Sequence, residues 1–385
     1  MVDVFIGGGA VLVDGELREA DVWCRDGLIA AVGALDAPAG AEAVDARGLI
    51  VAPGFVDAQL NGGWGHDFTS DPESIDAVAA ELPATGVTTF LPTIVTAAPE
   101  RRTAALAAHR SSRPRPGTAS VGGLHFEGPM IAPGRVGAHD PAWVGAVDPA
   151  ELATWTPAVR LVTLAPETPG ALAAIRSLAA AGIVVSIGHT ACSAGEFAAA
   201  RSAGATAVTH LFNAMAPFSH RSPGPIGATL ADPGVVAGMI CDGIHADPVA
   251  VAMAWQALGP NRTLLVTDAM AALGLTSQTD DELCQTQHVM LGERRVTIGA
   301  DGVRTAEGVL AGSNLAMDQA VRNLVAFTGC TAADALGCAS RVPADLLGFS
   351  DRGRVEPGAR ADLVLLDDAL HVQRTLIEGV TAWKS

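Results

Sequence analysis

Short apolar runs alternate with alanine-rich helical patterns between about residues 53 and 349. The runs are nearly continuous in apolar side chains, which is typical of parallel strands buried on both faces. Segments such as 72–86 and 168–182 between them carry apolar residues at helical spacing and end in glycine, as helices often do. Eight strands are predicted, at 54–60, 87–95, 119–128, 159–167, 183–190, 205–213, 235–243 and 263–270.

Eight buried strands alternating with helices predict an α/β fold, a closed (β/α)8 barrel of the TIM type. A doubly wound open sheet is the structural alternative, because strands are easily miscounted in one sequence. Polar side chains at the C-terminal strand ends favour the barrel, where these ends converge on one face and form active sites. They are Gln59, Asn61, Glu127, Glu167, His189, His210, Asp242 with His245, and Asp268.

The two ends of the chain have a different pattern. Residues 1–52 and 350–385 alternate and turn like short strands, with glycine and aspartate at the bends. Since each end holds half a sheet, we expect them to pair in a small β-sandwich domain, leaving 53–349 as the barrel domain. After the eighth strand, residues 271–307 are polar and predict an irregular loop over the site, and 313–329 and 331–340 predict closing helices.

Composition excludes some classes of protein. The formal charge of −17 argues against a nucleic-acid surface, so an anion would have to be met by local Arg, His and backbone N–H groups. The N-terminus has neither a basic segment nor an apolar stretch long enough for a signal peptide or a membrane span. Six scattered cysteines indicate reduced thiols, and we expect a cytoplasmic location. They are Cys24, Cys192, Cys241, Cys284, Cys330 and Cys338.

Glu127, His189 and His210 end the third, fifth and sixth predicted strands. Two imidazoles and one carboxylate form the ligand set of a catalytic zinc that keeps a position open for water. A single histidine at a strand end is more often a hydrogen-bonded core residue, so the prediction depends on the shared barrel phase of the three. Zinc suits these ligands best, although iron, cobalt or nickel would tolerate them.

Asp268 ends the eighth predicted strand. A carboxylate facing a metal-activated water can take its proton and later pass it to a leaving amine. The structural alternative is a helix N-cap, because the stretch VTDAMAALG could begin a helix at this aspartate.

Arg221 and His245 are the best candidates for binding an anion. Arg221 lies in a loop rich in glycine and proline, and His245 follows Asp242 by three residues. An arginine fork is the usual partner of a phosphate, although exposed arginines are mostly only solvated. His125 could support the metal ligands or pack in the core. No role is assigned to His66, His109, His220, His288 or His371.

Motifs in this order resemble the N-acetylglucosamine-6-phosphate deacetylase family of the amidohydrolase superfamily, nearly from end to end. They are PGFVDAQLNG, HFEGPMIAPGRVGAHD, IGHT, THLFNAM, CDGIHAD, VTDAM, LAGSNLAMDQAVRNLV and GARADLVLLD. The resemblance implies metal ligands at Glu127, His189 and His210 and an acid/base at Asp268. It also implies a homodimer and a sugar-phosphate site made of Ala138, Asn213, Ala214, Arg221, His245, Leu310, Ala311 and Gly312.

The sequence departs from many amidohydrolases at two positions. Gln59 and Asn61 stand where those enzymes have His-x-His, and amides are poor zinc ligands, so we expect a vestigial second metal position. The single lysine, Lys384, lies outside the barrel, so no lysine can form a bridging carbamate there. One divalent metal per subunit is therefore expected.

The resemblance implies hydrolysis of N-acetylglucosamine 6-phosphate to glucosamine 6-phosphate and acetate. One alternative is another amide hydrolase on the same scaffold, acting on N-acetylgalactosamine 6-phosphate or on an N-acylated D-amino acid. The other is a non-catalytic scaffold that has lost its chemistry, for which the absent His-x-His and lysine give some motive. The complete Glu, His, His and Asp set argues against that second alternative.

Overall fold

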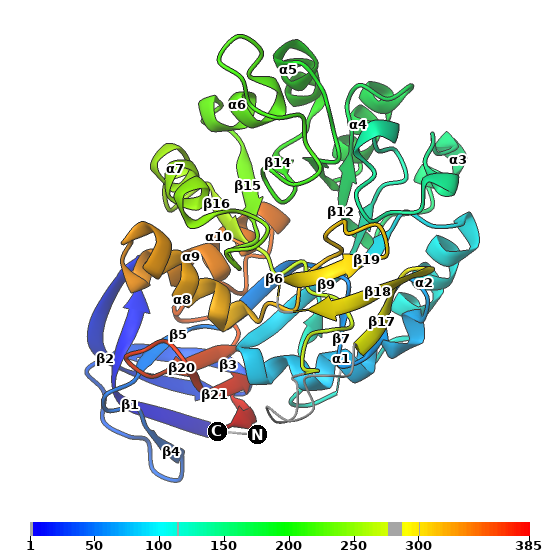
Figure 1. The fold of residues 1–385 in the computed structure, drawn as a ribbon. Helices are drawn as coiled ribbons and strands as arrows, with labels where there is room; N and C mark the ends of the chain where they lie inside the picture. Colours follow the sequence, from blue (N-terminus) through cyan, green and yellow to red (C-terminus); the bar gives the residue numbers. More distant parts are fainter. Residues whose placement is uncertain (1–2, 114, 276–286, 300) are drawn as a thin grey trace.

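A computed structural model describes residues 3–113, 115–275, 287–299 and 301–385. A barrel of parallel strands surrounded by helices occupies the middle of the chain, and a sheet from both chain ends lies beside it (Figure 1). The barrel strands, in spatial order, are β6 (Phe55–Leu60), β9 (Val87–Val95), β11 (Leu124–Glu127), β12 (Val159–Leu164), β13 (Val184–Ile187), β14 (Ala207–Val208), β15 (Val236–Met239) and β16 (Thr263–Leu265), with β10 (Ser120–Val121) also on β9.

The first and last barrel strands meet at their C-terminal ends. Leu60 and Ala269 form a parallel bridge, the Asn61 amide donates to the Ala269 carbonyl at 2.7 Å, and the Asp268 amide donates to the Gln59 carbonyl at 2.9 Å. The strands therefore follow one another around a nearly closed barrel, whereas a doubly wound sheet would reverse its order. This arrangement confirms the predicted fold class.

The helices cover the outside of the barrel (Figure 1). Several begin at side-chain caps, as at α5, where Ser193 and Glu196 form a capping box directly after the loop that follows β13. The helices are α1 (Ile75–Glu81), α2 (Pro99–Ser111), α3 (Pro149–Leu152), α4 (Ala171–Ala180), α5 (Ala194–Ala203), α6 (Gly224–Ala231), α7 (Pro248–Leu258), α8 (Met317–Thr328), α9 (Ala332–Ala339) and α10 (Arg341–Leu347). Within the described ranges, no helix is long and apolar enough to cross a membrane.

Strands from both chain ends share one sheet, as expected. β5 pairs antiparallel with β20, with Val51 opposite Leu365, and the sheet packs around its own apolar core. The chain enters the barrel between β5 and β6, but the exact domain boundaries remain a prediction. The strands are β1 (Asp3–Val13), β2 (Glu16–Arg25), β3 (Leu28–Gly33), β4 (Glu42–Asp45), β5 (Ile50–Pro53), β20 (Leu363–Leu366), β21 (Val372–Ile377) and β22 (Val380–Lys384).

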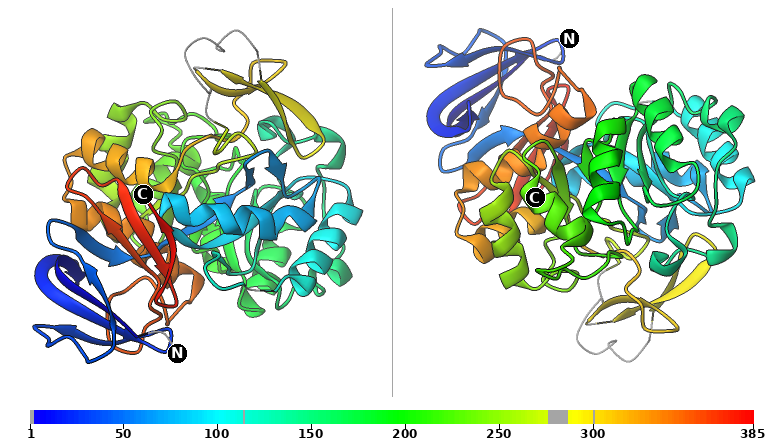
Figure 2. Two further views of the ribbon diagram at one scale, coloured as in Figure 1. Left: turned by 90° about the horizontal axis from the view of Figure 1, so that it is seen from below. Right: turned by 90° about the horizontal axis from the view of Figure 1, so that it is seen from above.

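The segment after β16 differs from its prediction. Instead of an irregular loop, the described part from residue 287 onward forms an antiparallel sheet of β17 (Gln287–Leu291), β18 (Arg294–Gly299) and β19 (Gly302–Thr305), while 276–286 lie outside the described residues. Figure 2 shows this sheet and the terminal sheet at opposite sides of the barrel. β7 (Gly62–Gly63) and β8 (His66–Asp67) form a further small pair after β6.

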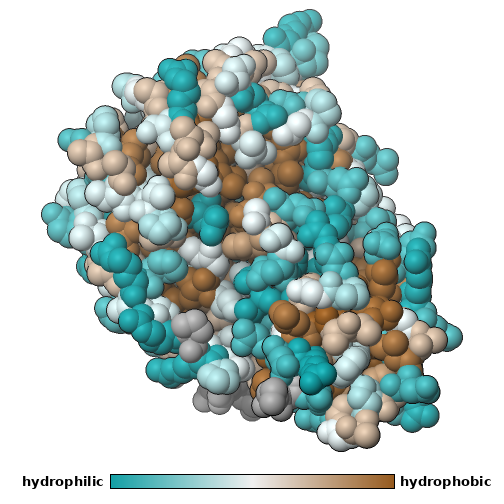
Figure 3. Space-filling view, turned by 180° about the vertical axis from the view of Figure 1, so that it is seen from behind, coloured by the Kyte–Doolittle hydropathy of each residue, from teal (hydrophilic) through white to brown (hydrophobic). Residues whose placement is uncertain are grey.

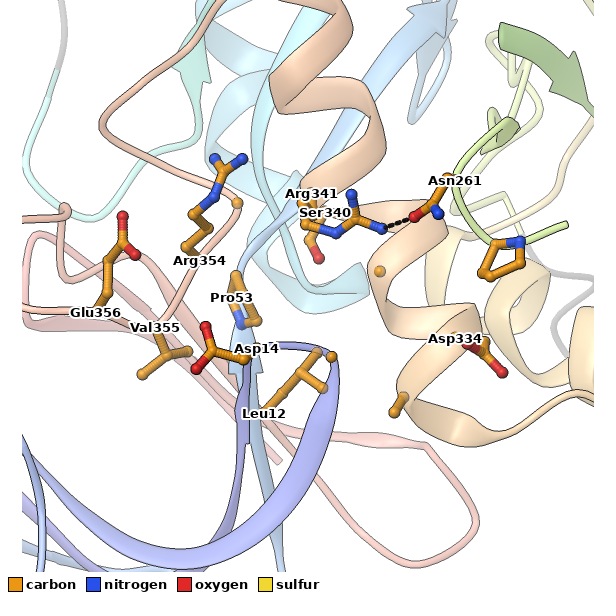
Figure 4. Close-up of a pocket in the computed structure, with 15 residues that line it drawn as sticks. Leu12, Asp14, Pro53, Asn261, Asp334, Ser340, Arg341, Arg354, Val355 and Glu356 are labelled. Atoms are coloured by element: carbon orange, nitrogen blue, oxygen red, sulfur yellow. Dashed lines mark hydrogen bonds between the residues drawn. The ribbon is translucent and has the colours of Figure 1, made fainter. Parts of the chain in front are cut away.

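A cavity of about 460 Å³ lies where the terminal sheet meets α9 and α10 (Figure 4). Its lining includes Pro53 and Asn261, which precede β6 and β16, so it lies toward the N-terminal ends of the barrel strands. Arg341 and Arg354 are its basic side chains. Catalytic groups of barrel enzymes lie at the opposite strand ends.

Candidate active site

A second cavity, of about 290 Å³, opens at the C-terminal ends of the barrel strands. Residues from nine segments of the chain meet there, including the loop after β11 and the segment after β19. Its lining comprises Asn61, Val95, Glu127, Gly134, Arg135, Gly137, Ala138, His139, His189, His210, Asn213, Ala214, His245, Asp268, Leu291, Val309, Leu310 and Gly312.

Three of the predicted site residues stand at a left-handed bend just beyond a strand. His189, His210 and Asp268 have φ values of +48°, +27° and +48°, a conformation that is uncommon for residues other than glycine. Such strain persists only where surrounding contacts fix it, and it concentrates at functional sites. His189 lies just after β13, His210 just after β14 and Asp268 just after β16.

Glu127, His189 and His210 converge on one point, as predicted. Glu127 Oε1 lies 3.1 Å from His189 Nε2 and 2.9 Å from His210 Nε2, and the two nitrogens lie 3.2 Å apart. All three side chains are almost completely buried. Burial opposes the charge on Glu127, but hydrogen bonds from the histidines outweigh it and hold the pKa of this carboxyl well below its usual range.

A hydrogen bond of His189 determines which of its two ring nitrogens carries the hydrogen. Its Nδ1 lies 2.8 Å from the Arg135 carbonyl oxygen, which can only accept, so Nδ1 carries the hydrogen. In the neutral ring, Nε2 then points a lone pair at Glu127 Oε1 and at His210 Nε2, and only the protonated ring can donate the hydrogen bond to Glu127. These groups need a proton or a cation between them. Accordingly, the Glu127 hydrogen bond raises the pKa of His210 despite burial.

His139 was missed by sequence reasoning. Its Nε2 lies 3.6 Å from Glu127 Oε2, and its ring centre lies 4.4 Å from that of His189. Glu127, His139 and His189 also form a buried group close enough to hold a metal ion. The segment HFEGPMIAPGRVGAHD contains both Glu127 and His139, so accounting for every histidine in that motif could have found it. Arg135, in the same segment, also lines the cavity.

Asp268 lies next to this group and is held by the two amides at the end of β6. Asn61 Nδ2 donates to Asp268 Oδ1 at 2.8 Å, and Gln59 Nε2 donates to the same oxygen at 3.1 Å. Burial and the nearby charge of Glu127 raise the pKa of Asp268 to about 6. The helix N-cap alternative does not hold, because no helix begins at Asp268.

The predicted substrate-binding residues divide into two groups. Six of them line the cavity, whereas Ala311 is buried behind it and Arg221 lies exposed in the loop before α6, outside the cavity of its own chain. The six are Ala138, Asn213, Ala214, His245, Leu310 and Gly312. His245 is oriented by Asp242, whose Oδ2 lies 2.6 Å from His245 Nδ1.

Two other residues from the sequence analysis support the site from outside. Glu167 accepts hydrogen bonds from the Thr190 hydroxyl and the Ala191 amide, both at 2.6 Å, and so anchors the loop after His189. His125 lies fully buried between the hydroxyls of Thr93 and Thr163. Burial lowers the pKa of His125 to about 4, so it is a neutral core residue at pH 7.

Comparison with known proteins shows to which family this chain belongs. Residues 50–382 match the amidohydrolase family. N-acetylglucosamine-6-phosphate deacetylase of Homo sapiens is 40% identical, covering 97% of this chain and 94% of the relative. The chain belongs to this family. N-acetylgalactosamine-6-phosphate deacetylase of Escherichia coli O157:H7 is 38% identical, with 96% of both chains covered.

A solved amidohydrolase structure extends the likeness to three dimensions. It is an aspartate-to-alanine variant of N-acetyl-D-glucosamine-6-phosphate deacetylase from Mycobacterium smegmatis, in complex with N-acetyl-D-glucosamine-6-phosphate. It superposes with a TM-score of 0.89 at 36% identity and covers 99% of this chain and 100% of its own. The family resemblance inferred from the motifs is therefore confirmed.

Proposed function

We propose that this amidohydrolase removes the acetyl group of N-acetyl-D-glucosamine 6-phosphate, giving D-glucosamine 6-phosphate and acetate in amino-sugar catabolism and cell-wall sugar recycling. The observation that carries the proposal is the convergence of Glu127, His189 and His210 on one point beside Asp268. The substrate class comes from the relatives, several of which carry that activity in their names.

We propose one divalent metal ion per subunit, zinc, held by Glu127, His189 and His210. The fit rests on lone pairs that face one another at about hydrogen-bond distance and need a cation or proton between them. His139 is the rival third ligand. Because His139 Nδ1 already pairs with the Thr96 hydroxyl at 2.8 Å and its Nε2 faces the other carboxylate oxygen, His210 fits better.

A cation held there would polarise the amide carbonyl and make water a stronger nucleophile near neutral pH. Asp268 lies beside these ligands with a pKa raised to about 6, so it is ionised at pH 7 and still basic enough to accept a proton. As the carbon–oxygen bond forms, Asp268 takes a proton from the attacking water. It returns that proton to nitrogen as the carbon–nitrogen bond breaks, and acetate and the free amine leave.

We propose that the phosphate is bound by Asn213, Ala214, His245 and the backbone near Leu310, together with Arg221 from a second subunit. Arg221 is exposed outside the cavity of its own chain, so it can serve a neighbouring one. Phe218, three residues before it, is 54% exposed beside α6. Val249 and Met253 on α7 are also exposed, and α6 contacts α7.

An apolar surface of this kind fits a homodimer. Figure 3 shows hydrophobic areas among hydrophilic ones on the face opposite to that of Figure 1. Co-expression of Arg221→Ala and Asp268→Asn chains tests the shared site. A mixed dimer regains one intact site if Arg221 acts on the partner, because the Arg221→Ala chain keeps Asp268 and receives the other chain's Arg221. Absence of recovery in isolated mixed dimers would place Arg221 outside the partner's site.

A cytoplasmic location is proposed on the state of the thiols. All five cysteines in the described ranges are free, and burial raises the pKa of Cys24 and Cys192 to about 12, so they stay protonated. Such thiols suit a reducing compartment.

The second candidate function is deacetylation of N-acetylgalactosamine 6-phosphate, favoured by the 38% identical relative with that name. The test is acetate release from both sugar phosphates and from unphosphorylated N-acetylglucosamine, measured with metal content before and after chelation. We expect the glucosamine epimer to have the higher kcat/KM and chelation to abolish turnover. Faster turnover of the galactosamine epimer would favour the alternative, and metal-free protein without activity would favour a scaffold.

A further inference from the structure

The amide side chains of Gln59 and Asn61 form a clasp around one oxygen of Asp268. Asn61 Nδ2 and Gln59 Nε2 both donate to Oδ1, at 2.8 and 3.1 Å. No described residue donates to Oδ2, and Asp268 lines the cavity. One carboxylate oxygen is therefore fixed while the other is left for chemistry.

The same amide of Gln59 also donates to Glu127 Oε1, at 3.1 Å. Its two N–H groups thus join the two buried carboxylates of the site, whose charges repel each other. Because an amide is neutral, this bridge fixes both carboxylates without cancelling the charge on either.

The backbone of these residues holds Asp268 as well. The Asp268 amide donates to the Gln59 carbonyl at 2.9 Å, and the Asn61 amide donates to the Ala269 carbonyl at 2.7 Å. These bonds fix the left-handed bend at Asp268, with φ of +48°. Side chain and main chain are therefore held by the same end of β6.

Asn61 leaves its own Oδ1 buried without a hydrogen-bond partner among the described residues. The nitrogen of this amide is identified by the carboxylate it faces, because a carboxylate oxygen accepts and does not donate. A buried unsatisfied oxygen is unfavourable and uncommon, and such groups call for an explanation. The hydrogen bond from Asn61 Nδ2 to Asp268 Oδ1 supplies that explanation, because it fixes the orientation of the amide.

We propose that Gln59 and Asn61 are positioning residues for Asp268, in place of the vestigial role expected from the sequence. They fix Oδ1 so that Oδ2 faces the reacting atoms. The inference rests on the proposed deacetylation, because it assigns Asp268 the proton transfer that the clasp would serve.

Asn61→Ala in the zinc-loaded enzyme tests the clasp most directly, because the Asn61 side chain donates to Asp268 and not to Glu127. Loss of such a supporting partner typically costs about 10- to 100-fold. We expect that loss in kcat, with KM within about threefold and zinc content unchanged. Asn61→Asp keeps the shape but replaces the N–H by an oxygen that repels Asp268, so its kcat should be lower still.

Gln373→Ala is the matched control. Gln373 Nε2 donates to Asp367 Oδ2 at 2.9 Å in the terminal sheet, so this variant also removes an amide–carboxylate hydrogen bond, but far from the cavity. Its kcat should equal that of the wild type. An Asn61→Ala enzyme with kcat within twofold of wild type, or with a loss that only follows lost zinc, would overturn the proposal.

Crystal structures of wild-type and Asn61→Ala enzymes decide the case independently of turnover. We expect the Asp268 carboxylate to rotate or to occupy several conformers in the variant. An unchanged Asp268 would overturn the positioning role. Wild-type enzyme that releases no acetate from either sugar phosphate would instead overturn the proposed function, and the crystallographic comparison would still judge the clasp.

Discussion

The cavity at the C-terminal strand ends and the cavity beside the terminal sheet differ in the state of their charged groups more than in size. The terminal-sheet cavity is larger, about 460 against 290 Å³. Its arginines are satisfied: Arg341 donates to Asn261 Oδ1 at 2.7 Å, and Arg354 pairs with Asp345. Both arginine side chains are about one-third exposed. Water and neighbouring side chains therefore already satisfy the hydrogen-bond donors and the charge of both arginines.

In the smaller cavity, ionisable groups are buried, and they face one another instead of water. Glu127, His189 and His210 have side chains only 3–5% exposed, and their lone pairs converge. His189 and His210 themselves stand at left-handed bends of the backbone. The comparison teaches that unsatisfied, buried and pre-positioned groups identify the chemical site better than volume does.

The largest effect should follow loss of a proposed metal ligand. His210→Ala removes one of the converging nitrogens, so metal affinity should fall by more than the ~10–100-fold typical of losing a supporting partner, and turnover should fall to background. His139→Ala should retain the metal. Elemental analysis after dialysis measures both. The opposite result would move the ion to the Glu127, His139 and His189 group.

Asp268→Asn should have the next largest effect. It keeps the size of the side chain but removes the base, and general acid–base catalysis typically contributes about 10²- to 10⁴-fold. We expect kcat to fall by roughly that factor with zinc content and product binding unchanged. Calorimetric titration with glucosamine 6-phosphate checks binding. Turnover near that of the wild type would remove Asp268 from the mechanism.

The barrel and the convergence of Glu127, His189 and His210 could be predicted because they follow from local pattern. Parallel strands buried on both faces produce continuous apolar runs, and Glu127, His189 and Asp268 stand where such runs end. Once the barrel phase is known, its geometry brings distant strand ends together.

Most of the parts that were missed depend on contacts between distant residues, which the pattern of strand ends does not encode. In β18, Val296 is the one fully buried residue, so this strand produces no apolar run and β17–β19 looked like a polar loop. His139 lies in a loop, away from any strand end. The bonds from Gln59 and Asn61 to Asp268 span more than 200 positions, and only the closed barrel brings these residues together.

Arg221→Ala should affect substrate binding more than turnover. Hydrogen bonds to a charged group are worth roughly 1.5–3 kcal/mol, which corresponds to about a 10- to 150-fold rise in KM for the sugar phosphate. Hydrolysis of unphosphorylated N-acetylglucosamine should be unchanged. Arg47→Ala, at an exposed arginine on the terminal sheet, is the control. An equal loss on both substrates would contradict a phosphate contact.

The pH dependence of kcat tests whether burial tunes Asp268. The group must be ionised to accept a proton, so activity should fall as pH decreases through its pKa, about tenfold per unit below it. Burial raises that pKa to about 6, and a bound cation would lower it, so the acid limb should lie at or below pH 6. Because the substrate phosphate also titrates near pH 6, the profile should be repeated with unphosphorylated substrate. A limb that vanishes there would belong to the phosphate.

The smallest effect should come from the terminal-sheet cavity. Arg354→Ala breaks the pair with Asp345, but both side chains are partly exposed, and such pairs typically contribute about 0–1 kcal/mol. We expect kcat and KM to match the wild type and urea unfolding to change by no more than that amount. Because Arg354 meets solvent and an existing partner, its removal leaves no buried charge uncompensated. A large loss of activity would show that this cavity also takes part in function, and the contrast between the two cavities would no longer hold.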